Sequence, residues 1–477
     1  MTSSPAAGQL YIDGVFCPPA SGRTATVTDK ATGAVIGSYG LGDAADVDRA
    51  VAAARAAQPA WAALGAPERA AGLRRFAEYL QAHYEDLVRQ SMRETGGVRA
   101  KADDEVSTGI KQLQISMVQA TENAGDLLPP YKAGKLSMSR AVPLGVIGVI
   151  TPWNYPVNLA LRAVAPALAF GNTVVLKPAE LTPVIGGQLL AEAADAAGLP
   201  PGVFNVVTGD GPEAGHALAE HTGLDLMDFT GSREVGLAIA ASAAATLRPI
   251  RLELGGSNAF LVLDDADVDL AASCAMVASL EFQGQTCISA SRHIVMRAVA
   301  DRYLDALTRR AAALRVGDPL SGEVEQGPLI SEKQRDRVHH DIVGASVAMG
   351  AEIRTGGSYD GLFYRPTVLA NVTAKMPAFI EEIFGPVLPV TVVDTEEEAI
   401  ALANGLPMLM DSVFTADLIR GLGVAERLEA GEVHINDAHA RHGADDQMGG
   451  FTRRQWIGVQ RTPLALPEWT ADPAGRA

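Results

Sequence analysis

Residues 144–178 read LGVIGVITPWNYPVNLALRAVAPALAFGNTVVLKP, and the alternation within this stretch decides the fold class. Its two ends, 144–151 and 172–178, are continuous runs rich in β-branched residues, whereas the middle has the pattern of a helix. Strand runs that stay apolar at every position are typical of a parallel sheet covered on both faces. The stretch therefore predicts a strand, a helix from Val157 and a second, parallel strand.

The same alternation continues to about residue 255. The further predicted elements are strands at 204–209, 224–230 and 250–256, and helices near 184–197, after Pro212 and after Ser232. Ligands of such sheets bind at the carboxyl ends of the strands, so the residues that follow each strand are the first candidates for chemistry. A second α/β alternation runs from about 257 to 436 and predicts another domain.

The N-terminal part of the chain has two other patterns. Up to about residue 40, polar and apolar residues alternate around turn signals, which predicts short antiparallel strands. From Asp46 to about Thr121, apolar residues recur at three- and four-residue spacing, which predicts amphipathic helices. We therefore predict an α/β protein in which a cofactor-binding domain precedes a second α/β domain.

The composition is that of a globular protein with more than one domain. The chain has 477 residues, of which 48% are hydrophobic and 20% charged, so it is too long for one ordinary core. Its formal charge of −17 comes from scattered acidic residues, which disfavours nucleic acids and anionic membranes as partners. The three cysteines are odd in number and lack a CxxC spacing, so we predict neither a disulfide framework nor a metal site.

The cellular location is predicted from the termini and the cysteines. The N-terminus has no basic region followed by an apolar core, so no secretory signal is expected. The longest apolar stretch, 141–170, contains four prolines and an arginine, which a membrane span tolerates poorly. Because the cysteine pattern fits a reducing compartment best, we expect a cytoplasmic protein.

Cys287 is the candidate nucleophile. It follows Gly284, Gln285 and Thr286 in the sequence GQTC, where little apolar bulk surrounds the sulfur. By contrast, Cys274 lies in the apolar run AASCAMVASL and is expected to fill space in a core. A reactive cysteine attacks as the thiolate, and its chemistry also needs an oxyanion donor and, for hydrolysis, a base.

Two residues after strands are candidates for those further groups. Asn154 lies between two prolines in TPWNYP, in a rigid turn from which its amide can donate to a developing oxyanion. Glu253 ends a strand before two glycines and is a candidate general base. Taken singly, each has an ordinary interpretation, namely a structural asparagine in a proline-rich turn and a solvated glutamate.

Three motifs after strands are candidates for a dinucleotide site. GDGPEA, from Gly209, matches G-x-G-x-x-A between a strand and a helix, although a tight turn explains it equally well. In FTGSREVG, Ser232 is a natural N-cap with free amides for an anion; a plain capped helix is the alternative. In LKPAE, Glu180 can bind ribose hydroxyls and repel the extra phosphate of NADP, unless it forms a solvated surface pair with Lys177.

Taken together, these motifs resemble those of the NAD(P)-dependent aldehyde dehydrogenase superfamily. PWNYP, LKPAE, FTGSREVG, ELGGSN, GQTC and EEIFGPV occur in that family's order and roughly its spacing, over residues 8 to about 436. The resemblance implies that Cys287 is the nucleophile, Glu253 the base that activates water, and Asn154 the oxyanion donor. It implies a cofactor site made of Thr151, Trp153, Lys177, Glu180, Gly209, Gly231, Ser232, Glu382 and Phe384.

Within that implied cofactor site, the residues divide by the part of the dinucleotide that they would contact. Lys177 and Glu180 match the contacts to the adenosine ribose, and Ser232, with the glycine before it, matches the turn at the pyrophosphate. Glu382 and Phe384 match the clamp on the nicotinamide ribose, and Trp153 lies along the cofactor. The resemblance thus moves the phosphates from GDGPEA to FTGS and leaves Gly209 as a close-packing residue near the adenine.

The resemblance also implies an architecture. The expected fold is that of an α/β aldehyde dehydrogenase, with a Rossmann-type parallel-sheet cofactor domain, an α/β catalytic domain and a small oligomerisation arm. The implied boundaries are 1–121 and 142–254 for the NAD-binding domain, 255–440 for the catalytic domain, and 122–141 with 441–477 for the arm. Because relatives form dimers and tetramers, a homodimer or homotetramer is expected.

The implied reaction is oxidation of an aldehyde to a carboxylic acid with NAD or NADP, through a thiohemiacetal and a thioester on the cysteine. SRHIV, HIND and FTRRQWIGVQ are most similar to the benzaldehyde and vanillin dehydrogenase branch, which implies an aryl aldehyde. The predicted substrate contacts are Asn158, Arg162, Thr286 and Ile288. Arg162 shares a helical face with Asn154 and Asn158 and favours a substrate with an anionic or oxygen-bearing tail, with a structural ion pair as the alternative.

Three departures from the family pattern leave alternatives open. Phe282 and Gln283 stand where relatives commonly carry an asparagine, and the loop NGLPMLM is one residue shorter than usual. The segment P-F-G-G-x-x-x-S-G survives only as Gly449 and Gly450. One alternative is therefore a catalytically slow or idle homologue with a binding role. Another is a CoA-acylating relative, which Glu253 disfavours because that reaction has no use for a water-activating base.

Overall fold

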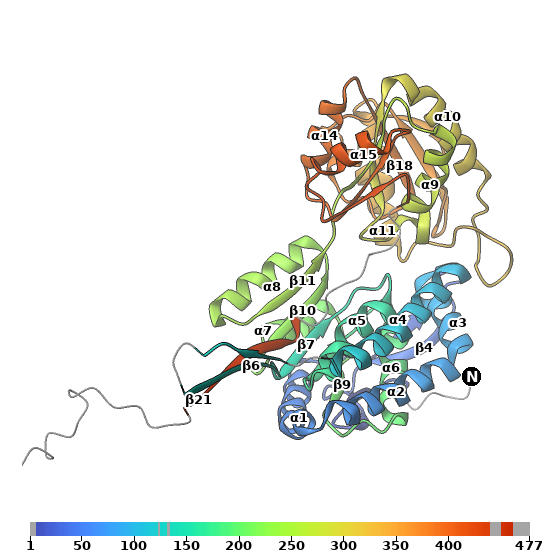
Figure 1. Ribbon diagram of the computed structural model, residues 1–477. Helices are drawn as coiled ribbons and strands as arrows, with labels where there is room; N and C mark the ends of the chain where they lie inside the picture. The colour runs from blue at the N-terminus through green and yellow to red at the C-terminus, as the bar shows by residue number, and fades with distance from the viewer. Residues whose placement is uncertain (1–5, 123–124, 131–133, 439–449, 461–477) are drawn as a thin grey trace, which may run out of the picture.

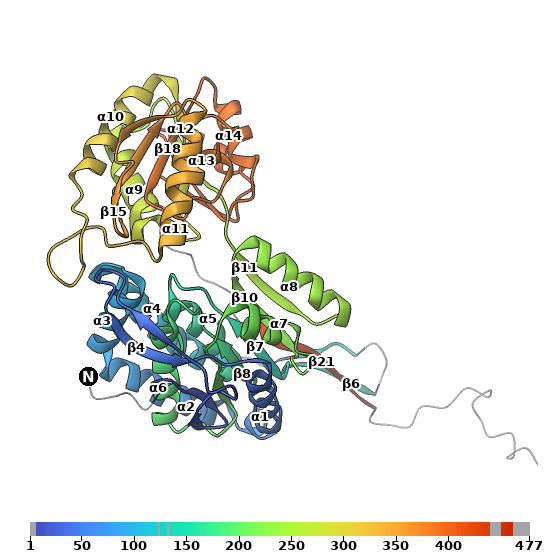
Figure 2. The same cartoon turned by 180° about the vertical axis from the view of Figure 1, so that it is seen from behind.

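The computed structural model describes residues 6–122, 125–130, 134–438 and 450–460, with only the backbone described at 455–460. Two α/β domains lie one above the other, and a narrow ribbon of strands extends from the lower one (Figure 1; Figure 2). Each domain is built on a seven-stranded sheet. Within the described part of the chain, no helix is both long and apolar enough to cross a membrane.

The first sheet contains the parallel strands expected from the sequence. Its strands, in spatial order, are β11 (Ile250–Leu254), β10 (Leu226–Gly231), β7 (Val146–Ile150), β8 (Thr173–Lys177), β9 (Phe204–Val206), β1 (Leu10–Ile12) and β2 (Val15–Cys17). The five strands from β7 to β11 are parallel, and β1 and β2 add an antiparallel edge. The predicted parallel sheet is confirmed.

Successive residues of the central strands enter hydrophobic cores on opposite faces of this sheet. Ile147 and Val149 belong to one core, whereas Val146 and Val175 belong to the other. Both faces are therefore covered, which explains why these strands are apolar at nearly every position. The helices of this domain are α1 (Ala44–Ala63), α2 (Ala66–Ala82), α3 (Tyr84–Thr95), α4 (Arg99–Ala120), α5 (Pro156–Ala169), α6 (Leu189–Ala196), α7 (His216–Glu220) and α8 (Arg233–Thr246).

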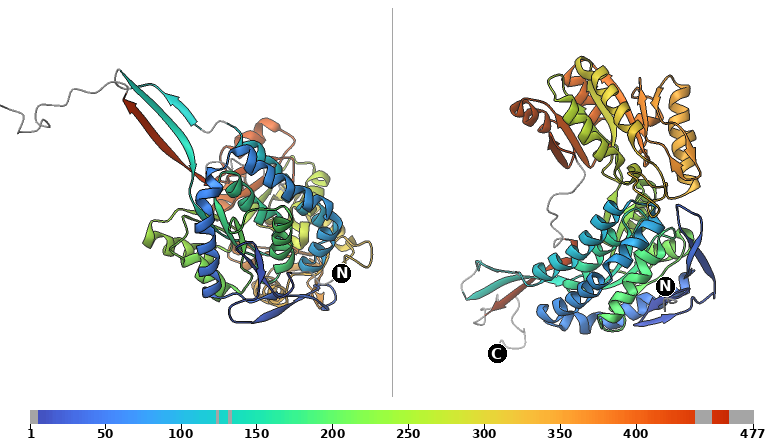
Figure 3. Two further views of the ribbon diagram at one scale, coloured as in Figure 1. Left: turned by 90° about the horizontal axis from the view of Figure 1, so that it is seen from below. Right: turned by 90° about the vertical axis from the view of Figure 1, so that its right-hand side faces the viewer.

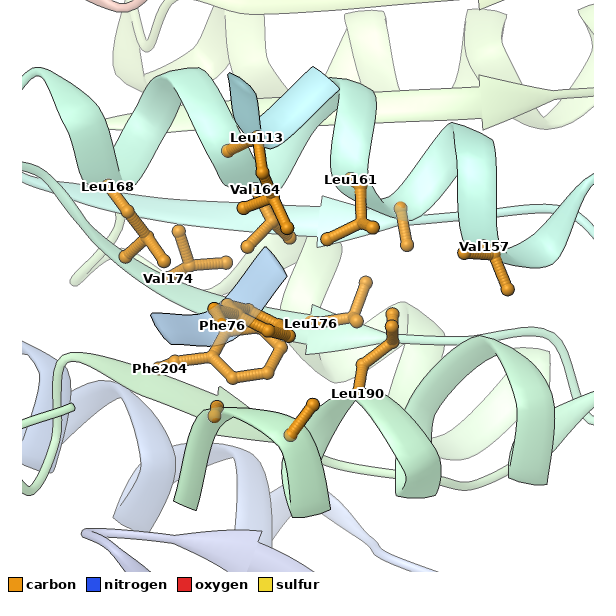
Figure 4. Close-up of a cluster of buried hydrophobic side chains, with 14 of the residues drawn as sticks. Phe76, Leu113, Val157, Leu161, Val164, Leu168, Val174, Leu176, Leu190 and Phe204 are labelled. Carbon is orange, nitrogen blue, oxygen red and sulfur yellow. The ribbon is translucent and has the colours of Figure 1, made fainter. Parts of the chain in front are cut away.

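Helix α5 is fixed against β8 by the larger core. The figure labels Phe76, Leu113, Val157, Leu161, Val164, Leu168, Val174, Leu176, Leu190 and Phe204 (Figure 4). The α5 residues among them recur every three or four positions, so they form one face of the helix. Each such buried side chain stabilises the fold by about 1.5–3 kcal/mol. This packing sets where the turn before α5, which contains Asn154, meets the edge of the sheet.

Two of the predicted helices begin differently from the expectation. The helix expected near 184–197 starts with a π-helical turn at Val184–Gln188 before α6, and the one after Pro212 starts with a π-helical turn at Gly211–Gly215 before α7. In the N-terminal region, β3 (Thr24–Thr28) and β4 (Val35–Gly40) form the predicted antiparallel hairpin.

The second domain carries the other α/β alternation. Its sheet has, in spatial order, β14 (Glu352–Thr355), β17 (Thr367–Ala370), β18 (Val387–Val393), β13 (Ala290–Met296), β12 (Asn258–Val262), β19 (Met410–Phe414) and β20 (Glu432–Ile435). All neighbours are parallel except β14 and β17. The remaining elements are α9 (Val268–Leu280), α10 (Arg297–Ala313), α11 (Glu332–Asp336), α12 (Ala345–Ala348), α13 (Pro377–Ile380), α14 (Glu396–Asn404), α15 (Leu418–Ala425), β15 (Tyr359–Asp360) and β16 (Phe363–Tyr364).

A three-stranded antiparallel ribbon projects from the first domain (Figure 3). It consists of β5 (Gly125–Leu128), β6 (Lys135–Pro143) and β21 (Thr452–Gln460), with β6 in the middle. The predicted arm segment 122–141 contains β5 and most of β6, and the predicted tail 441–477 is described only at 450–460. Asn172 donates to the Phe451 carbonyl at 3.0 Å, which ties the start of β21 to the first domain.

Candidate active site

A cleft of about 620 Å³ lies where the carboxyl ends of β7, β10 and β11 face the second domain. It is lined by predicted catalytic, cofactor and substrate residues from distant parts of the chain, namely Trp153, Asn154, Arg162, Gly231, Ser232, Glu253, Cys287, Glu382 and Phe384. The fold thus brings both domains to one cavity. The lining also includes Gln334, Arg337, Pro407 and Leu409, which were not among the predicted site residues.

The loop that carries Cys287 has an unusual backbone. Phe282, Gln283 and Gly284 have φ angles of 49°, 57° and 67°, so three successive residues are left-handed. A Cβ on Gly284 would lie 2.3 Å from the Gly385 carbonyl oxygen, which explains why glycine is needed there. Left-handed backbone is unfavourable for phenylalanine and glutamine, so contacts from outside the loop must hold it.

Polar contacts supply part of that support. The Gln283 amide donates to the Gly96 carbonyl at 3.0 Å and to the Pro328 carbonyl at 2.8 Å, which joins the loop to both domains. The Gln285 side chain accepts from the Ile330 N–H at 3.1 Å. These glutamines therefore act as anchors of the loop.

Asn258 holds the peptide of the candidate nucleophile itself. Its fully buried side-chain amide donates to the Cys287 carbonyl at 2.9 Å and to the Ser289 carbonyl at 3.0 Å. Its oxygen accepts from the N–H groups of Leu409 and Met410 at 2.9 and 3.2 Å. Asn258 ends the motif ELGGSN, but no local pattern in the sequence indicates its contacts with loops some 30 and 150 residues away.

The Cys287 sulfur lies in a mixed electrostatic environment. Burial raises the pKa of the Cys287 thiol to about 11; the Glu382 carboxylate adds to this rise, and the Arg162 guanidinium opposes it. Because this value is above neutral pH, the resting group is a thiol. Any attack by the thiolate therefore needs a proton acceptor and nearby positive charge.

Asn154 lies in the turn between β7 and α5, immediately across from the cysteine loop. Its amide donates to the Gln285 carbonyl at 3.1 Å, two residues before Cys287. Pro152 and Pro156 restrict the turn. Pro156 is well suited to the first position of the helix, because an N–H there would have no partner within the helix. The side-chain amide is thus held beside the candidate nucleophile.

Glu253, at the end of β11, faces the cleft and is paired rather than free. Its Oε1 lies 3.4 Å from Nη2 of Arg162 on α5, while 38% of its side chain stays exposed to solvent. Behind it, Arg251 and Asp228 on neighbouring strands form a second ion pair at 2.9 Å. Burial raises the pKa of Asp228 to about 6, although Arg251 opposes this rise.

Glu382 and Phe384 reach the cleft from the loop after α13. A Cβ on Gly255 would lie 2.2 Å from the Glu382 carboxylate, so only glycine allows this approach to the end of β11. Burial raises the pKa of Glu382 to about 7, while Arg337 lowers it. Phe384 packs edge-on against Trp153 at a centroid distance of 5.4 Å, which encloses one side of the cleft.

The predicted adenosine contacts lie past β8 and do not line this cleft. Lys177 is buried and donates to the Pro178 carbonyl at 2.7 Å, with the half-exposed Glu180 carboxylate 3.9 Å from its ammonium. A Cβ on Gly209 would lie 2.8 Å from both Ala214 Cβ and the Gly42 carbonyl, so Gly209 is a close-packing residue. Ser232 caps α8 by accepting from the Val235 N–H.

The remaining predicted contacts also lie outside the cleft lining. Thr286 shares a hydrogen bond of 2.8 Å with Ser289, and Ile288 is partly buried. Within the described part of the chain, the buried oxygens Thr151 Oγ1, Asn154 Oδ1, Asn158 Oδ1 and Glu382 Oε1 have no hydrogen-bond partner. Such orphaned acceptors are costly unless a bound molecule or water satisfies them.

Comparisons with known proteins establish the family. Residues 16–471 match the profile of the aldehyde dehydrogenase family. The chain belongs to the aldehyde dehydrogenase family. It is 41% identical to the benzaldehyde dehydrogenase [NAD(+)] of Pseudomonas putida over 94% of this chain and 96% of that protein. It is 42% identical to a vanillin dehydrogenase of Amycolatopsis sp. over 90% of this chain and 88% of that protein.

The same aldehyde dehydrogenase fold is found in solved structures. A betaine aldehyde dehydrogenase of Staphylococcus aureus in complex with NAD+ superimposes with a TM-score of 0.94 at 30% identity, over 98% of this chain and 97% of that one. The fold class, the family and the NAD(P) dependence predicted from the sequence are therefore confirmed. The protein is an aldehyde dehydrogenase that oxidises aldehydes to carboxylic acids, and the idle-homologue alternative is set aside.

Proposed function

We propose that this aldehyde dehydrogenase oxidises an aromatic or oxygen-bearing aldehyde through a covalent intermediate on Cys287. The observation that carries the proposal is the convergence of Cys287, Asn154, Glu253 and Arg162 on one cleft. It supplies a sulfur nucleophile, an amide donor, a carboxylate base and a guanidinium that can face a polar substituent. The similarity to benzaldehyde and vanillin dehydrogenases supports the aryl class.

In the first half-reaction, the Cys287 thiol passes its proton to the Glu253 carboxylate, and the thiolate adds to the aldehyde carbon. The C=O bond becomes an oxyanion, which accepts hydrogen bonds from the Asn154 amide and the Cys287 N–H. The oxyanion then reforms the C=O bond as the carbon loses hydride, which leaves a thioester on Cys287. The oxidised nicotinamide ring, when bound, supplies the acceptor for that hydride.

In the second half-reaction, Glu253 acts on water. The proton taken from Cys287 leaves first, through the exposed side of the carboxylate. Glu253 then takes a proton from water while the water oxygen adds to the thioester carbon, and the C–S bond breaks to release the carboxylic acid and the thiolate. In this proposal, Glu253 exchanges its contact of 3.4 Å with Arg162 for a hydrogen bond with the attacking water.

The predicted cofactor residues fit a dinucleotide. Glu382 Oε1 is a buried acceptor without a partner among the described residues, and ribose hydroxyls are donors that would satisfy it. Glu180, exposed beside Lys177, would hold the adenosine ribose and disfavour an added phosphate, so NAD is the preferred coenzyme in this proposal. Trp153 and Phe384 would flank the nicotinamide end and exclude water.

A second substrate class is an aliphatic aldehyde with a terminal carboxylate. The observation that favours it is Arg162, whose guanidinium lines the cleft beside Cys287 and Glu253. A substrate carboxylate would compete with Glu253 for this cation, whereas a hydroxyl or methoxy group on a ring would bind without releasing Glu253. The two substrate classes thus differ in whether the substrate itself releases Glu253 from Arg162.

The test is an aldehyde panel run with NAD and with NADP. Benzaldehyde, a hydroxy-methoxybenzaldehyde, an unbranched alkanal and a ω-carboxy aldehyde are compared by kcat/KM from cofactor reduction. The highest value for the aryl aldehydes with NAD is expected, and mass spectrometry with and without CoA should find the free acid in both. Cofactor binding without reduction by any aldehyde would overturn the proposal, and a CoA thioester product would favour the acylating alternative.

The assembly and location expected from the sequence stay predictions. A homodimer or homotetramer would use the ribbon of β5, β6 and β21, which projects from the first domain (Figure 3). Light scattering would establish the number of subunits. The cytoplasmic location is tested by fractionation of the source cells.

A further inference from the structure

A fully buried lysine lies behind the cysteine loop and takes no part in the mechanism above. Lys101, in the first turn of α4, places its ammonium 2.5 Å from the carboxylate of Glu105, and neither side chain is exposed beyond 1%. The ammonium also lies 4.6 Å from the ring centroid of Tyr155 and 4.4 Å from that of Phe282. Such distances allow cation–π attraction, which is strongest where water is excluded.

The partner of this lysine holds the start of α5. Glu105 accepts the Val157 N–H at 2.9 Å with one carboxylate oxygen, and the Ser91 hydroxyl at 2.7 Å with the other. The Val157 N–H is one of the donors in the first helical turn that the helix itself leaves free. Because Asn154 lies three residues earlier, the Lys101–Glu105 pair fixes the base of the turn that carries the oxyanion donor.

The other contact of this lysine is with the strained part of the cysteine loop. Phe282 is buried with a φ angle of 49°, a conformation that persists only where surrounding groups impose it. Its ring packs between Lys101, Tyr155 at 5.9 Å and Trp153 at 6.4 Å. The Phe282 ring thus contacts the Lys101 ammonium on one side and Trp153 on another, and Trp153 itself lines the cleft.

A buried charge is expensive to maintain, which makes a purely space-filling role a poor explanation. Burial lowers the pKa of Lys101, and Glu105 opposes this effect. A buried ion pair is often no more stabilising than apolar residues of the same volume, so its presence needs another reason. Here the pair contacts both segments that carry reacting groups, the turn before α5 and the loop before Cys287.

We propose that Lys101 is a positioning residue, which holds the Phe282 ring and the Tyr155 turn together so that Cys287 and Asn154 keep their catalytic separation. The proposal rests on the proposed roles of Cys287 and Asn154. It assigns to the first domain a direct part in setting the geometry of a nucleophile that belongs to the second.

The main test compares Lys101→Met with Lys30→Met in the full chain. Lys30 is the matched control, because it is also a buried lysine of the first domain beside carboxylates, at Asp29 and Glu94, and it does not line the cleft. We expect Lys101→Met to lower both kcat and the rate of Cys287 alkylation by iodoacetamide by about tenfold to a hundredfold. The Kd for NAD and the shift in Tm should match those of Lys30→Met.

A second variant covers the possibility that the unpaired Glu105 unfolds the chain. Lys101→Met combined with Glu105→Gln removes both charges and keeps an acceptor for the Val157 N–H, while the new NH2 group can donate to the Ser91 hydroxyl oxygen, which then accepts instead of donating. The same loss of kcat and alkylation rate is expected in this folded double variant. Alkylation and kcat equal to those of Lys30→Met, in either variant, would overturn the proposal.

A double-mutant cycle separates positioning from general stability. Asparagine tolerates left-handed backbone, so Phe282→Asn removes the ring and relaxes the strain at once. Lys101→Met should then cost less than threefold in kcat in the Phe282→Asn background, since the contact it supports is gone. Additive effects would contradict the proposal. If the wild-type chain oxidises no aldehyde, the proposed function fails instead, so the two failures are distinguishable.

Discussion

The two segments that carry the proposed reacting groups are held in place by different means. The turn with Asn154 is fixed within the first domain, by Pro152, by Pro156 at the start of α5, by the apolar face of that helix and by Glu105 on α4, which accepts the Val157 N–H. The loop with Cys287 has three successive left-handed residues and is fixed by distant groups that include Lys101, Gly96 and Asn258. One half of the site is thus held within a single domain, whereas the other depends on both.

The largest effect is expected from removal of the Cys287 sulfur. Cys287→Ala should abolish aldehyde oxidation, by about 10⁴-fold or more, because no covalent intermediate can form. Binding of NAD, followed by quenching of tryptophan fluorescence, should persist because the fold is unchanged. Residual activity near the wild-type level would show that the nucleophile lies elsewhere, and Cys274→Ala, outside the cleft, is the matched control.

The turn between β7 and α5 is tested by Asn154→Ala. Loss of the amide that donates toward the oxyanion should lower kcat by about 10²–10³. Because the prolines and α5 hold the turn without this side chain, Tm should change little. A large fall in Tm with unchanged kcat per folded molecule would make Asn154 a structural residue, as its contact with the Gln285 carbonyl alone would permit.

The loop with Cys287 depends on contacts with distant residues. This dependence is tested by comparing Gly284→Ala with Gly198→Ala. Both glycines have φ near 65°, but a Cβ meets the Gly385 carbonyl at 2.3 Å in the first and nothing within 4 Å in the second. The control should lose about 1 kcal/mol of stability from the backbone alone. Gly284→Ala should lose more and also lower kcat by about 10². Urea denaturation and initial rates measure the two effects, and equal losses would contradict the clash.

The smallest effect concerns the charge around the sulfur. Since burial raises the pKa of Cys287 to about 11, its alkylation in the free enzyme should rise about tenfold per pH unit up to that value. Arg162→Leu removes the cation that opposes this rise, so the rate at a given pH should fall by about threefold to tenfold. Peptide mass spectrometry follows the reaction, with Cys17 as the internal reference. A rate independent of pH from 7 to 9 would contradict the assignment.

The cofactor domain was predictable because its signals are local. Apolar runs such as 144–151 and 172–178 predict parallel strands from burial alone, and the strand ends then indicate where ligands bind. Asn154 and Glu253 were predicted in this way, since Asn154 lies in the turn after β7 and Glu253 lies in the last two residues of β11. The other candidate site residues, including Glu382 and Phe384, were predicted only from the resemblance to the family, because no periodicity in the sequence indicates them.

Several supporting residues were missed for a physical reason. Asn258 and Lys101 act through contacts with groups 29 to 181 positions away in the sequence, as the Lys101 contact with Phe282 illustrates. A buried lysine in an amphipathic helix has the same local pattern as an exposed one, so its role cannot be predicted. The sequence showed that Phe282 stands where relatives commonly carry an asparagine. It did not show that Lys101 on α4 contacts the Phe282 ring.

The sequence was enough for the family and the parallel sheets and indicated the candidate reacting groups, because hydrophobic burial and chemistry at strand ends leave local patterns. Only the tertiary structure decided that Glu253 pairs with Arg162, that Lys101 supports Phe282 and that Asn258 holds the Cys287 peptide. These contacts join segments that are remote along the chain. Side-chain distance and direction across such gaps are set by packing of the whole fold, and no local pattern contains them.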